Sequence, residues 1–261
     1  MKFAGIIAEY DPFHNGHAWQ LAQAKALGAE RVAVAMSCSL VQRGALPLLP
    51  EAVRTRSALT CGADLVFALP APCACAGAEA FARAGVALLA AAGCDGLVFG
   101  AETPDAALLM EAAELLDSGS YRAALKAQLA GGARSFAAAR QTAAAKLASD
   151  ERVAALLDKP NNNLAVEYCR AIRSLAPRME AYPLPRQGAN HGEALHSAHG
   201  QFASASALRK LWAEGGADAV APYVPEAVFP LYQEAYAAGQ YTDFSAAGRC
   251  ELALLRSACR G

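Results

Sequence analysis

Short apolar runs alternate with longer amphipathic segments over the first hundred residues of the chain. The apolar runs predict buried strands at Phe3–Ala8, Arg31–Met36, Asp64–Leu69 and Gly96–Phe99. Apolar residues at helical spacing between the runs predict helices at His17–Leu27, Pro50–Cys61 and Ala76–Ala92. Strands that are apolar throughout and separated by helices are typical of a parallel sheet covered on both faces, with right-handed crossovers. We therefore predict a doubly wound α/β fold.

The rest of the chain has a mainly helical pattern. An Ala-rich stretch from Pro104 to about Ser149 has helical spacing, with breaks at Gly119 and at Gly131-Gly132. Beyond it the pattern predicts a helix at Asn163–Leu175, a strand at Met179–Leu184, a polar loop at Gly188–Gly200, and a helix at Ser204–Glu214 with Ser204 as its N-cap. We expect one α/β domain over residues 1–215, with a helical insertion around 104–175, and a helical C-terminal segment over 216–261.

Composition and charge narrow the class of protein. Apolar residues make up 55% of the 261 residues and charged residues 18%, which is enough for a large core. The net charge is only -1, so an RNA partner would need a local basic patch. Arg43, Arg54 and Arg56 are the candidates for such a patch, because they could follow a phosphate backbone; the alternative is that they are separate solvated side chains.

Cysteines and the N-terminus indicate the compartment. None of the eight cysteines forms a C-x-x-C pair, and several lie inside apolar or Ala-rich runs. The N-terminal residues lead directly into a strand without the layout of a signal peptide, and no uninterrupted apolar run reaches membrane-spanning length. We expect a reduced, cytoplasmic protein with no membrane partner. The sequence makes no prediction of the oligomeric state.

The first chemistry-bearing residues follow the first predicted strand. Residues 14–17 are His-Asn-Gly-His, at the point where open α/β sheets bind ligands beyond the carboxyl ends of their strands. Gly16 lets a ligand approach the backbone, and the helix start offers N–H groups and a positive dipole end that suit phosphate. His14 and His17 can donate hydrogen bonds to phosphoryl oxygens and stabilise charge in a transition state. The alternative is a surface histidine followed by a helix cap.

A second polar group lies late in the chain. Ser204 and Ser206 stand at a predicted helix start with Arg209 one turn further on, where they could hold a polyphosphate or act as an N-cap followed by a solvated arginine. Arg186 follows the last predicted strand and could bind phosphate or lie in solvent. The other histidines lie between these residues: His191, His196 and His199. Their spacing fits no standard zinc pattern, so we predict no metal site.

Several motifs, in order along the chain, resemble one family. The opening segment Phe3–His17 resembles that of the bacterial tRNA(Met) cytidine acetate ligases, which belong to the wider HxGH nucleotidyltransferase superfamily. The other matching segments are Met36-Ser37, Gln42-Arg43-Gly44, Ala63-Asp64-Leu65-Val66, Leu69-Pro70, Phe99-Gly100-Ala101-Glu102, Lys159-Pro160-Asn161-Asn162 and Ala203–Lys210. Together they cover most of residues 1 to about 215 and are more specific than the HxGH motif alone.

The chain also differs from the family pattern at a few positions. Asp11 stands where the family usually has Asn, and Cys38 where it usually has Gly. Residues 45–47 are Ala-Leu-Pro in place of Glu-Pro-Ala, and a lysine expected near Glu51 is missing. The family is usually longer, with a further helical part after the region matched here. We therefore expect the C-terminal segment of this chain to be short relative to the family.

The resemblance implies a fold, a reaction and a set of site residues. The fold would be an HxGH nucleotidyltransferase-like variant of the Rossmann fold with helical additions in its C-terminal part. ATP would activate acetate as acetyl-adenylate, and the acetyl group would pass to the N4 amine of the wobble cytidine of elongator tRNA(Met). The implied catalytic residues are His14, His17, Ser204 and Arg209. The implied ATP-binding residues are Ile7, Ala8, Glu9, Tyr10, Asp11, Pro12, Phe13, His14, Asn15, Gly16, His17, Gln20, Gly100, Asn161, Asn162, Arg186, Ser204 and Ser206.

Magnesium is expected to accompany ATP, although the sequence offers no dedicated carboxylate cage and only Glu9, Asp11 and Glu102 as candidate ligands. Two other functions stay open. The first is adenylyl transfer onto a small phosphate-bearing metabolite, which the HxGH motif alone does not exclude. The second is a non-catalytic relative that binds nucleotide or RNA.

Overall fold

A five-stranded parallel sheet forms the centre of the computed structural model, which describes residues 1–186, 195–197, 200–244 and 246–248. Its strands lie in the order β3-β2-β1-β4-β5. Their bounds are Phe3–Ala8 for β1, Arg31–Ser37 for β2, Leu65–Leu69 for β3, Gly96–Ala101 for β4 and Glu180–Pro185 for β5. The predicted doubly wound α/β fold is therefore confirmed, and the predicted strand ends differ from the observed ones by two residues at most.

The strand order reverses at β1. From β1 the chain moves outward to β2 and β3 and then returns to the other side of β1 as β4, so that Ala4 has Val32 on one side and Gly96 on the other. Such a reversal leaves the connections on either side diverging to opposite faces, and opens a crevice at the carboxyl ends of the two strands. The topology thus sets a ligand site beyond β1 and β4.

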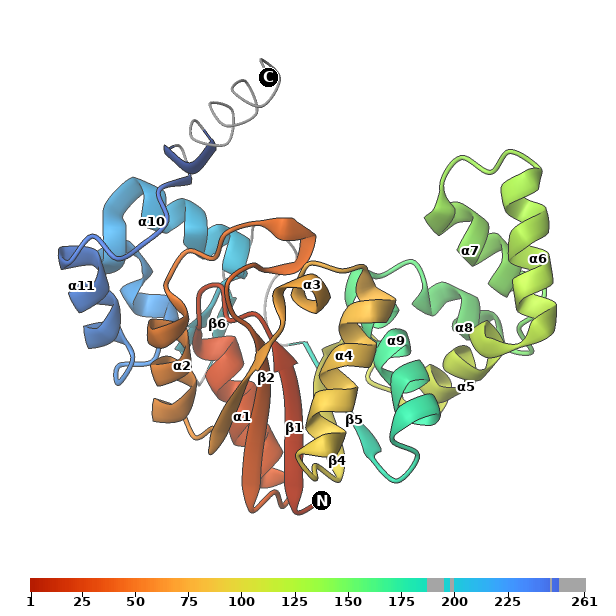
Figure 1. Ribbon diagram of the computed structural model, residues 1–261, viewed down its shortest axis with the longest axis horizontal. Helices are drawn as coiled ribbons and strands as arrows, with labels where there is room; N and C mark the ends of the chain where they lie inside the picture. Colours follow the sequence, from red (N-terminus) through yellow and green to blue (C-terminus); the bar gives the residue numbers. More distant parts are fainter. Residues whose placement is uncertain (187–194, 198–199, 245, 249–261) are drawn as a thin grey trace.

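Helices cover both faces of the sheet (Figure 1). One face carries α1, α2, α10 and α11, and the other carries α4, α5 and α9. Their bounds are Asn15–Ala26 for α1, Glu51–Thr60 for α2, Ala78–Ala91 for α4, Ala106–Asp117 for α5, Pro160–Leu175 for α9, Ala205–Val220 for α10 and Phe229–Ala237 for α11. Alternate residues of β2 enter the two cores, since Val32 and Val34 pack on the first face and Ala33 on the second.

Three further helices join α5 to α9, and a fourth, short helix follows β3. They are α6 (Gly119–Ala130), α7 (Phe136–Ala145) and α8 (Glu151–Leu156); a short helix, α3, spans Ala71–Ala74. Helices α6 and α7 stand away from the sheet at one side of the molecule (Figure 1), and we call residues 119–146 the arm. The predicted breaks are confirmed, because α6 begins at Gly119 after its N-cap Ser118 and ends at Gly131.

The C-terminal part differs from the prediction in two places. The boundary expected at residue 215 lies inside α10, which bends at Gly216 (φ 67°). This position requires glycine, because a Cβ there would lie 2.5 Å from the Tyr236 ring. Residues as far as Ala235 pack into the same core as β1. Within the expected loop 188–200, residues Leu195–Ser197 (β6) pair with Gly200–Phe202 (β7) as an antiparallel hairpin, and 187–194 and 198–199 lie outside the described residues.

Two short 3₁₀ turns complete the assignments, at Gln42–Gly44 and Ala221–Tyr223. The last part of the expected helical segment, residues 249–261, and the histidines His191 and His199 fall outside the described residues. In the part of the chain that the structure describes, no helix combines the length and the apolar character needed to cross a bilayer.

Candidate active site

A cleft of about 280 Å³ opens beyond the carboxyl ends of β1, β4 and β5. It lies at the strand-order reversal, where the topology places a ligand crevice. Nine residues predicted from the sequence line it: Ile7, His14, Gly16, His17, Gln20, Gly100, Asn161, Arg186 and Ser204. The cleft therefore collects predicted residues from five separate segments of the chain.

The two histidines of the HxGH motif form a capping box at the start of α1. His14 is the N-cap, with extended backbone, and its Nδ1 accepts a hydrogen bond from the Gly16 N–H at 3.1 Å. His17, at the third helical position, accepts the His14 N–H on its own Nδ1 at 3.3 Å. The two rings stack with their centroids 3.7 Å apart. Reciprocal caps of this kind satisfy helix-end donors and fix both side chains.

Gly16 is required by the position of the His14 ring. A Cβ at this residue would lie 2.9 Å from His14 Cε1 and 3.1 Å from its Nδ1, closer than a real side chain permits. The spacing of the HxGH motif thus follows from local sterics: the glycine leaves room for the first ring, and the fourth residue returns the second ring to the cap.

The hydrogen bonds assign one tautomer to both rings. Because each Nδ1 accepts a backbone N–H, the hydrogen of the neutral imidazole sits on Nε2. Burial lowers the pKa of His14 to about 4, helped by the Arg186 charge. Burial also lowers the pKa of His17 well below its usual range, with further contributions from His14 and Arg186. Near neutral pH, both side chains are therefore uncharged groups with one free N–H donor each.

Tyr10 and Phe13 support the His17 ring from behind. The Tyr10 ring lies edge-on at 4.8 Å between centroids and the Phe13 ring at 5.6 Å. Both aromatic side chains are almost fully buried, at 1% and 0% exposure. The sequence predicted them as ATP contacts, whereas the structure places them in the core, where they hold a residue that lines the cleft.

Arg186 supplies the charge of the cleft. It follows β5, its side chain is exposed, and it forms no ion pair with any residue that the structure describes. Ser204 lies nearby as the N-cap of α10, where its Oγ accepts the Ala207 N–H at 3.2 Å. The starts of α1 and α10 and one guanidinium group thus meet at the cleft. Helix N-termini and arginine both favour bound phosphate.

The opposite wall joins two of the sequence motifs. The Glu102 carboxylate accepts the Asn161 Nδ2 at 2.6 Å and the Asn162 backbone N–H at 2.7 Å, so it caps the N-terminus of α9. Asn161 lines the cleft. Asn162 was predicted to bind the nucleotide, but it is 1% exposed, and its Oδ1 accepts the Thr103 N–H at 2.9 Å. Asn162 therefore fixes the wall and does not line the cleft.

Arg209 lies outside the lining of the cleft. Its Nη1 donates to the Asp11 carboxylate at 3.1 Å and to the Asp11 carbonyl at 2.6 Å. Asp11 is 5% exposed and also accepts the Leu48 N–H at 2.6 Å, while burial raises its pKa. The predicted contact between Arg209 and phosphate is thus replaced by a contact with Asp11. Ser206, also predicted in the site, lies beside Ser204 with 3.1 Å between their Oγ atoms.

The candidate magnesium ligands all have internal partners. Glu9 accepts the Gln42 N–H, Asp11 is held by Arg209, and Glu102 caps α9. None of the three lines the cleft, and the described residues contain no group of His, Cys, Asp and Glu side chains that could hold a metal ion.

Arg54 corrects the predicted RNA-binding patch. It is 0% exposed, and its guanidinium donates to the carbonyls of Leu49 at 2.9 Å, Glu9 at 2.7 Å and Ser37 at 2.7 Å, and also to the carbonyl of Cys38. The prediction that this side chain contacts RNA is wrong, because backbone carbonyls at the ends of β1 and β2 enclose it. Arg56 is exposed, 3.9 Å from Glu234. The Arg43 side chain lies outside the described part of the chain.

Aromatic and apolar side chains that the sequence did not single out complete the cleft. The main ones are Trp19, Leu164 and Tyr168, and they lie together with Phe99 of the Phe99–Glu102 motif. Flat apolar side chains beside a phosphate-binding group suit an adenine ring. Their sequence signal was that of ordinary core positions on helices and strands, so nothing distinguished them before the fold was known.

Comparison with known proteins identifies the family. The model of the HIGH Nucleotidyl Transferase family matches residues 1–256, which is nearly the whole chain. The chain belongs to the HIGH nucleotidyl transferase family. The chain is 41% identical over 218 residues to a tRNA(Met) cytidine acetate ligase of Syntrophotalea carbinolica, covering 82% of the chain and 52% of the relative. A relative of the same name from Caldanaerobacter subterraneus is 35% identical over 92% of the chain and 60% of its own length.

Two solved structures of a related protein have a fold similar to that of the chain. Thermotoga maritima TmcAL bound with alpha-thio ATP matches with a TM-score of 0.83 at 30% identity, over 92% of the chain and 57% of that protein. The apo form of TmcAL matches with a TM-score of 0.84 at 31% identity, over 92% and 58%. The chain thus spans between half and two thirds of the length of these relatives.

Proposed function

We propose that this HIGH nucleotidyl transferase binds ATP in the cleft and activates acetate as acetyl-adenylate. The observation that carries the proposal is the His14–His17 capping box, which presents two neutral Nε2–H donors beside Arg186 at the strand-order reversal. Such fixed donors stabilise charge on phosphoryl oxygens without reorganisation during the reaction. The binding of alpha-thio ATP by a relative with the same fold supports a nucleotide in this cleft.

The reaction places clear demands on these groups. An acetate oxygen attacks the α-phosphorus, the bond from that phosphorus to the bridging oxygen breaks, and pyrophosphate leaves with the electron pair. Negative charge therefore grows on the departing pyrophosphate, where Arg186 and the two imidazole N–H groups would neutralise it. Trp19 and Tyr168 would enclose the adenine ring and limit the access of water.

Magnesium would enter with the nucleotide. Because Glu9, Asp11 and Glu102 are engaged within the protein, the phosphates of ATP and water would supply its ligands. Its charge would add to that of Arg186 on the phosphates.

The proposed acceptor is the N4 amine of the wobble cytidine of tRNA(Met), which attacks the acetyl carbonyl and releases AMP with loss of a proton. The names of the relatives favour this acceptor and acetate over a small phosphate-bearing metabolite. The two acceptors separate in one assay, in which AMP formation is measured with acetate plus tRNA(Met) and with a panel of mononucleotides. Mass analysis of cytidine from the tRNA then identifies the product.

Acetate-dependent exchange of labelled pyrophosphate into ATP tests the first step. We expect exchange with the unaltered chain, and a fall of about 10²- to 10³-fold for His17→Ala, which removes one donor. Arg186→Gln should also lower exchange. Arg178→Gln is the matched control, because Arg178 is an exposed arginine just before the amino end of the same strand, β5. No exchange with folded, unaltered protein would refute adenylation, and a normal rate for His17→Ala would remove His17 from the mechanism.

A further inference from the structure

The arm carries an unbalanced charge. Its residues, 119–146, include five of the 23 lysines and arginines of the chain and none of the 24 aspartates and glutamates. The five are Arg122, Lys126, Arg134, Arg140 and Lys146. Because the whole chain carries -1, the residues outside the arm sum to -6. Positive charge is thus concentrated on one projecting element of an otherwise acidic protein.

Four of these five cations are available to a partner. Arg140 pairs with the buried carboxylate of Glu167. The other four cations of the arm are exposed and form no ion pair with any residue that the structure describes; they are Arg122, Lys126, Arg134 and Lys146. Arg122 and Lys126 are four residues apart on α6, so they lie on the same face of the helix, about 5–6 Å apart at their Cβ atoms. Such a row of unpaired cations matches a phosphate backbone.

A groove between the arm and α4 adds an aromatic surface. Its volume is about 720 Å³, and Phe136, Arg122 and Arg83 contribute to its lining. The Phe136 side chain at the start of α7 is 61% exposed. The carboxylates of the groove are already paired, Glu167 with Arg140 and Arg170, and Glu79 with Arg170 at 3.5 Å. Arg83 donates to the Ser174 Oγ at 3.2 Å, whereas the Arg122 guanidinium has no such partner among the described residues. An exposed ring beside such a guanidinium group is a surface on which unpaired RNA bases stack.

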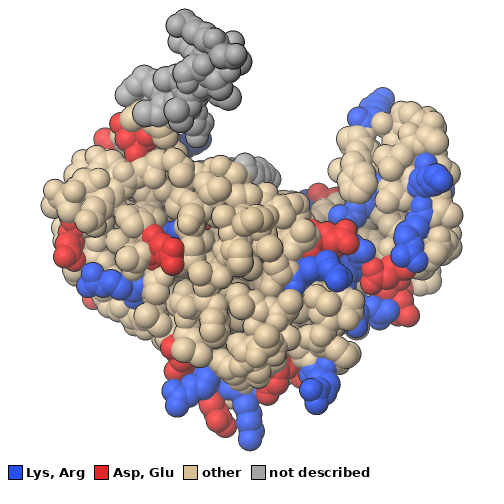
Figure 2. All heavy atoms as spheres, in the orientation of Figure 1, with Lys and Arg blue, Asp and Glu red and all other residues tan. Residues whose placement is uncertain are grey.

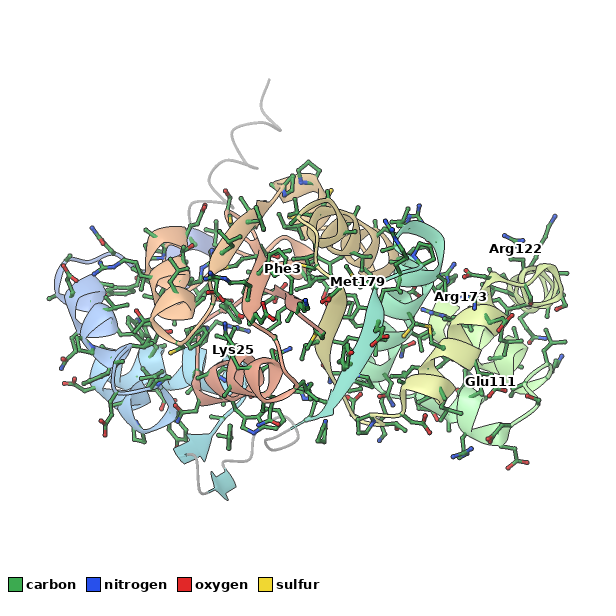
Figure 3. The ribbon with its side chains drawn as sticks, turned by 90° about the horizontal axis from the view of Figure 1, so that it is seen from below. Phe3, Lys25, Glu111, Arg122, Arg173 and Met179 are labelled. Carbon is green, nitrogen blue, oxygen red and sulfur yellow. The ribbon has the colours of Figure 1, made fainter. Side chains whose placement is uncertain are left out.

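The arm lies at the end of the molecule where the cleft opens. In Figure 1 the strands run upward from the N-terminus, and the arm rises on the right toward the same end as their carboxyl ends. Figure 2 shows an open hollow between the arm and the body, with lysine and arginine side chains along the arm. Figure 3 shows Arg122 at the far end of the molecule from Lys25 on α1. A long polyanion held by the arm would therefore pass beside the body at the level of the cleft.

We propose that the arm is the docking surface for the sugar-phosphate backbone of the tRNA substrate. This inference rests on the proposed function for the identity of the RNA. The RNA-binding basic patch would then lie on α6 and α7, and not on α2, where Arg54 is buried. Lysine and arginine side chains bind RNA by displacing condensed counterions, so binding falls as salt rises, in proportion to the number of phosphates neutralised.

The test compares two triple variants of the 261-residue chain with equal charge loss. The arm variant is R122Q/K126Q/R134Q. The control is K2Q/R31Q/R178Q, whose three exposed residues lie at the amino ends of the strands. Binding to a transcript of elongator tRNA(Met) is measured by gel shift across a salt series. Loss of two or three phosphate contacts should weaken binding by about 30- to 150-fold at 0.15 M salt and flatten the salt dependence by about two to three units of slope, with the control within about twofold of the unaltered chain.

Pyrophosphate exchange by the same variants separates this inference from the proposed function. The arm does not line the cleft, so exchange by the arm variant should match the unaltered chain. Arm-dependent tRNA binding without any exchange would refute the proposed reaction and leave the docking surface standing. Normal exchange with unchanged tRNA binding by the arm variant would refute the docking surface alone. An equal loss of tRNA binding in the control variant would also refute it. Binding to anionic lipid vesicles is measured in parallel: if the arm variant lost vesicle binding but kept tRNA binding, the docking surface for tRNA would be refuted.

Discussion

Replacing Arg54 with methionine should destabilise the protein strongly, although Arg54 contacts no part of the cleft. Its guanidinium donates to four backbone carbonyls, which belong to the end of β1, the end of β2 and the loop before α2. Methionine fills a similar volume but donates nothing, so buried acceptors are left without partners. Arg54 thus holds these three segments together next to the first turn after β1.

The magnitude follows from the number of acceptors. Each buried acceptor left unpaired costs about 1 kcal/mol or more, and relief of the buried charge offsets part of the sum, so Arg54→Met should lower the free energy of unfolding by about 3–5 kcal/mol. For a domain of this size, that loss corresponds to a fall in the melting temperature of about 10 °C. Arg56→Met changes an exposed side chain on the same helix and should cost less than about 0.5 kcal/mol.

Urea unfolding followed by circular dichroism measures both variants. Comparable slopes against urea would show that the unfolding transition is of the same kind, so that the midpoints can be compared. The reasoning fails if Arg54→Met lies within about 1 kcal/mol of the unaltered chain. It also fails if Arg56→Met is destabilised as much, because the loss of stability would then not come from the carbonyls that Arg54 contacts.

Two further predictions concern the capping box. The lowered pKa of His14 and His17 should keep their Cε1–H chemical shifts constant in NMR spectra from pH 8 to about 5.5, and a midpoint near 6.5 would contradict the assigned neutral state. Since the unfolded chain takes up these protons first, both rings should also reduce stability as the pH falls below about 6.5, and for His14 this loss continues to about pH 4. Gly16→Ala should weaken ATP binding, measured by calorimetry, about tenfold or more, because the new Cβ displaces the His14 ring. Gly119→Ala, which meets no atom within 4 Å, should bind normally, and equal affinity of the two variants would exclude the steric explanation.

The sheet was predictable because its strands are marked by local composition. Fully apolar runs such as Val32–Met36 have one stable environment, between two layers of helices, and glycines with positive φ follow α1, α2 and α4 at Gly28, Gly62 and Gly93. The position of the cleft followed from the same pattern, since the order of strands and helices fixes where ligands bind. The HxGH segment could therefore be located correctly before its geometry was known.

The roles of individual side chains depended on tertiary contacts that no local pattern contains. Arg54 looks like a surface residue on an amphipathic helix, and only the convergence of three backbone segments buries it. Arg209 has helical spacing suited to phosphate, but Asp11 approaches it from a segment nearly two hundred residues away. The arm shows the reverse case. Its charge imbalance is visible in the sequence, but its projection from the body gives that charge a meaning only in three dimensions.

The hydrogen bonds that Glu102 accepts from Asn161 and Asn162 have an evolutionary consequence. They tie the end of β4 to the start of α9, so the chain leaves the nucleotide-binding core and re-enters it at one fixed point. The arm lies in the segment between these two points, so its length and charge can change without moving Glu102 or the start of α9. Such an arrangement lets the arm vary its surface while the walls of the cleft stay in place.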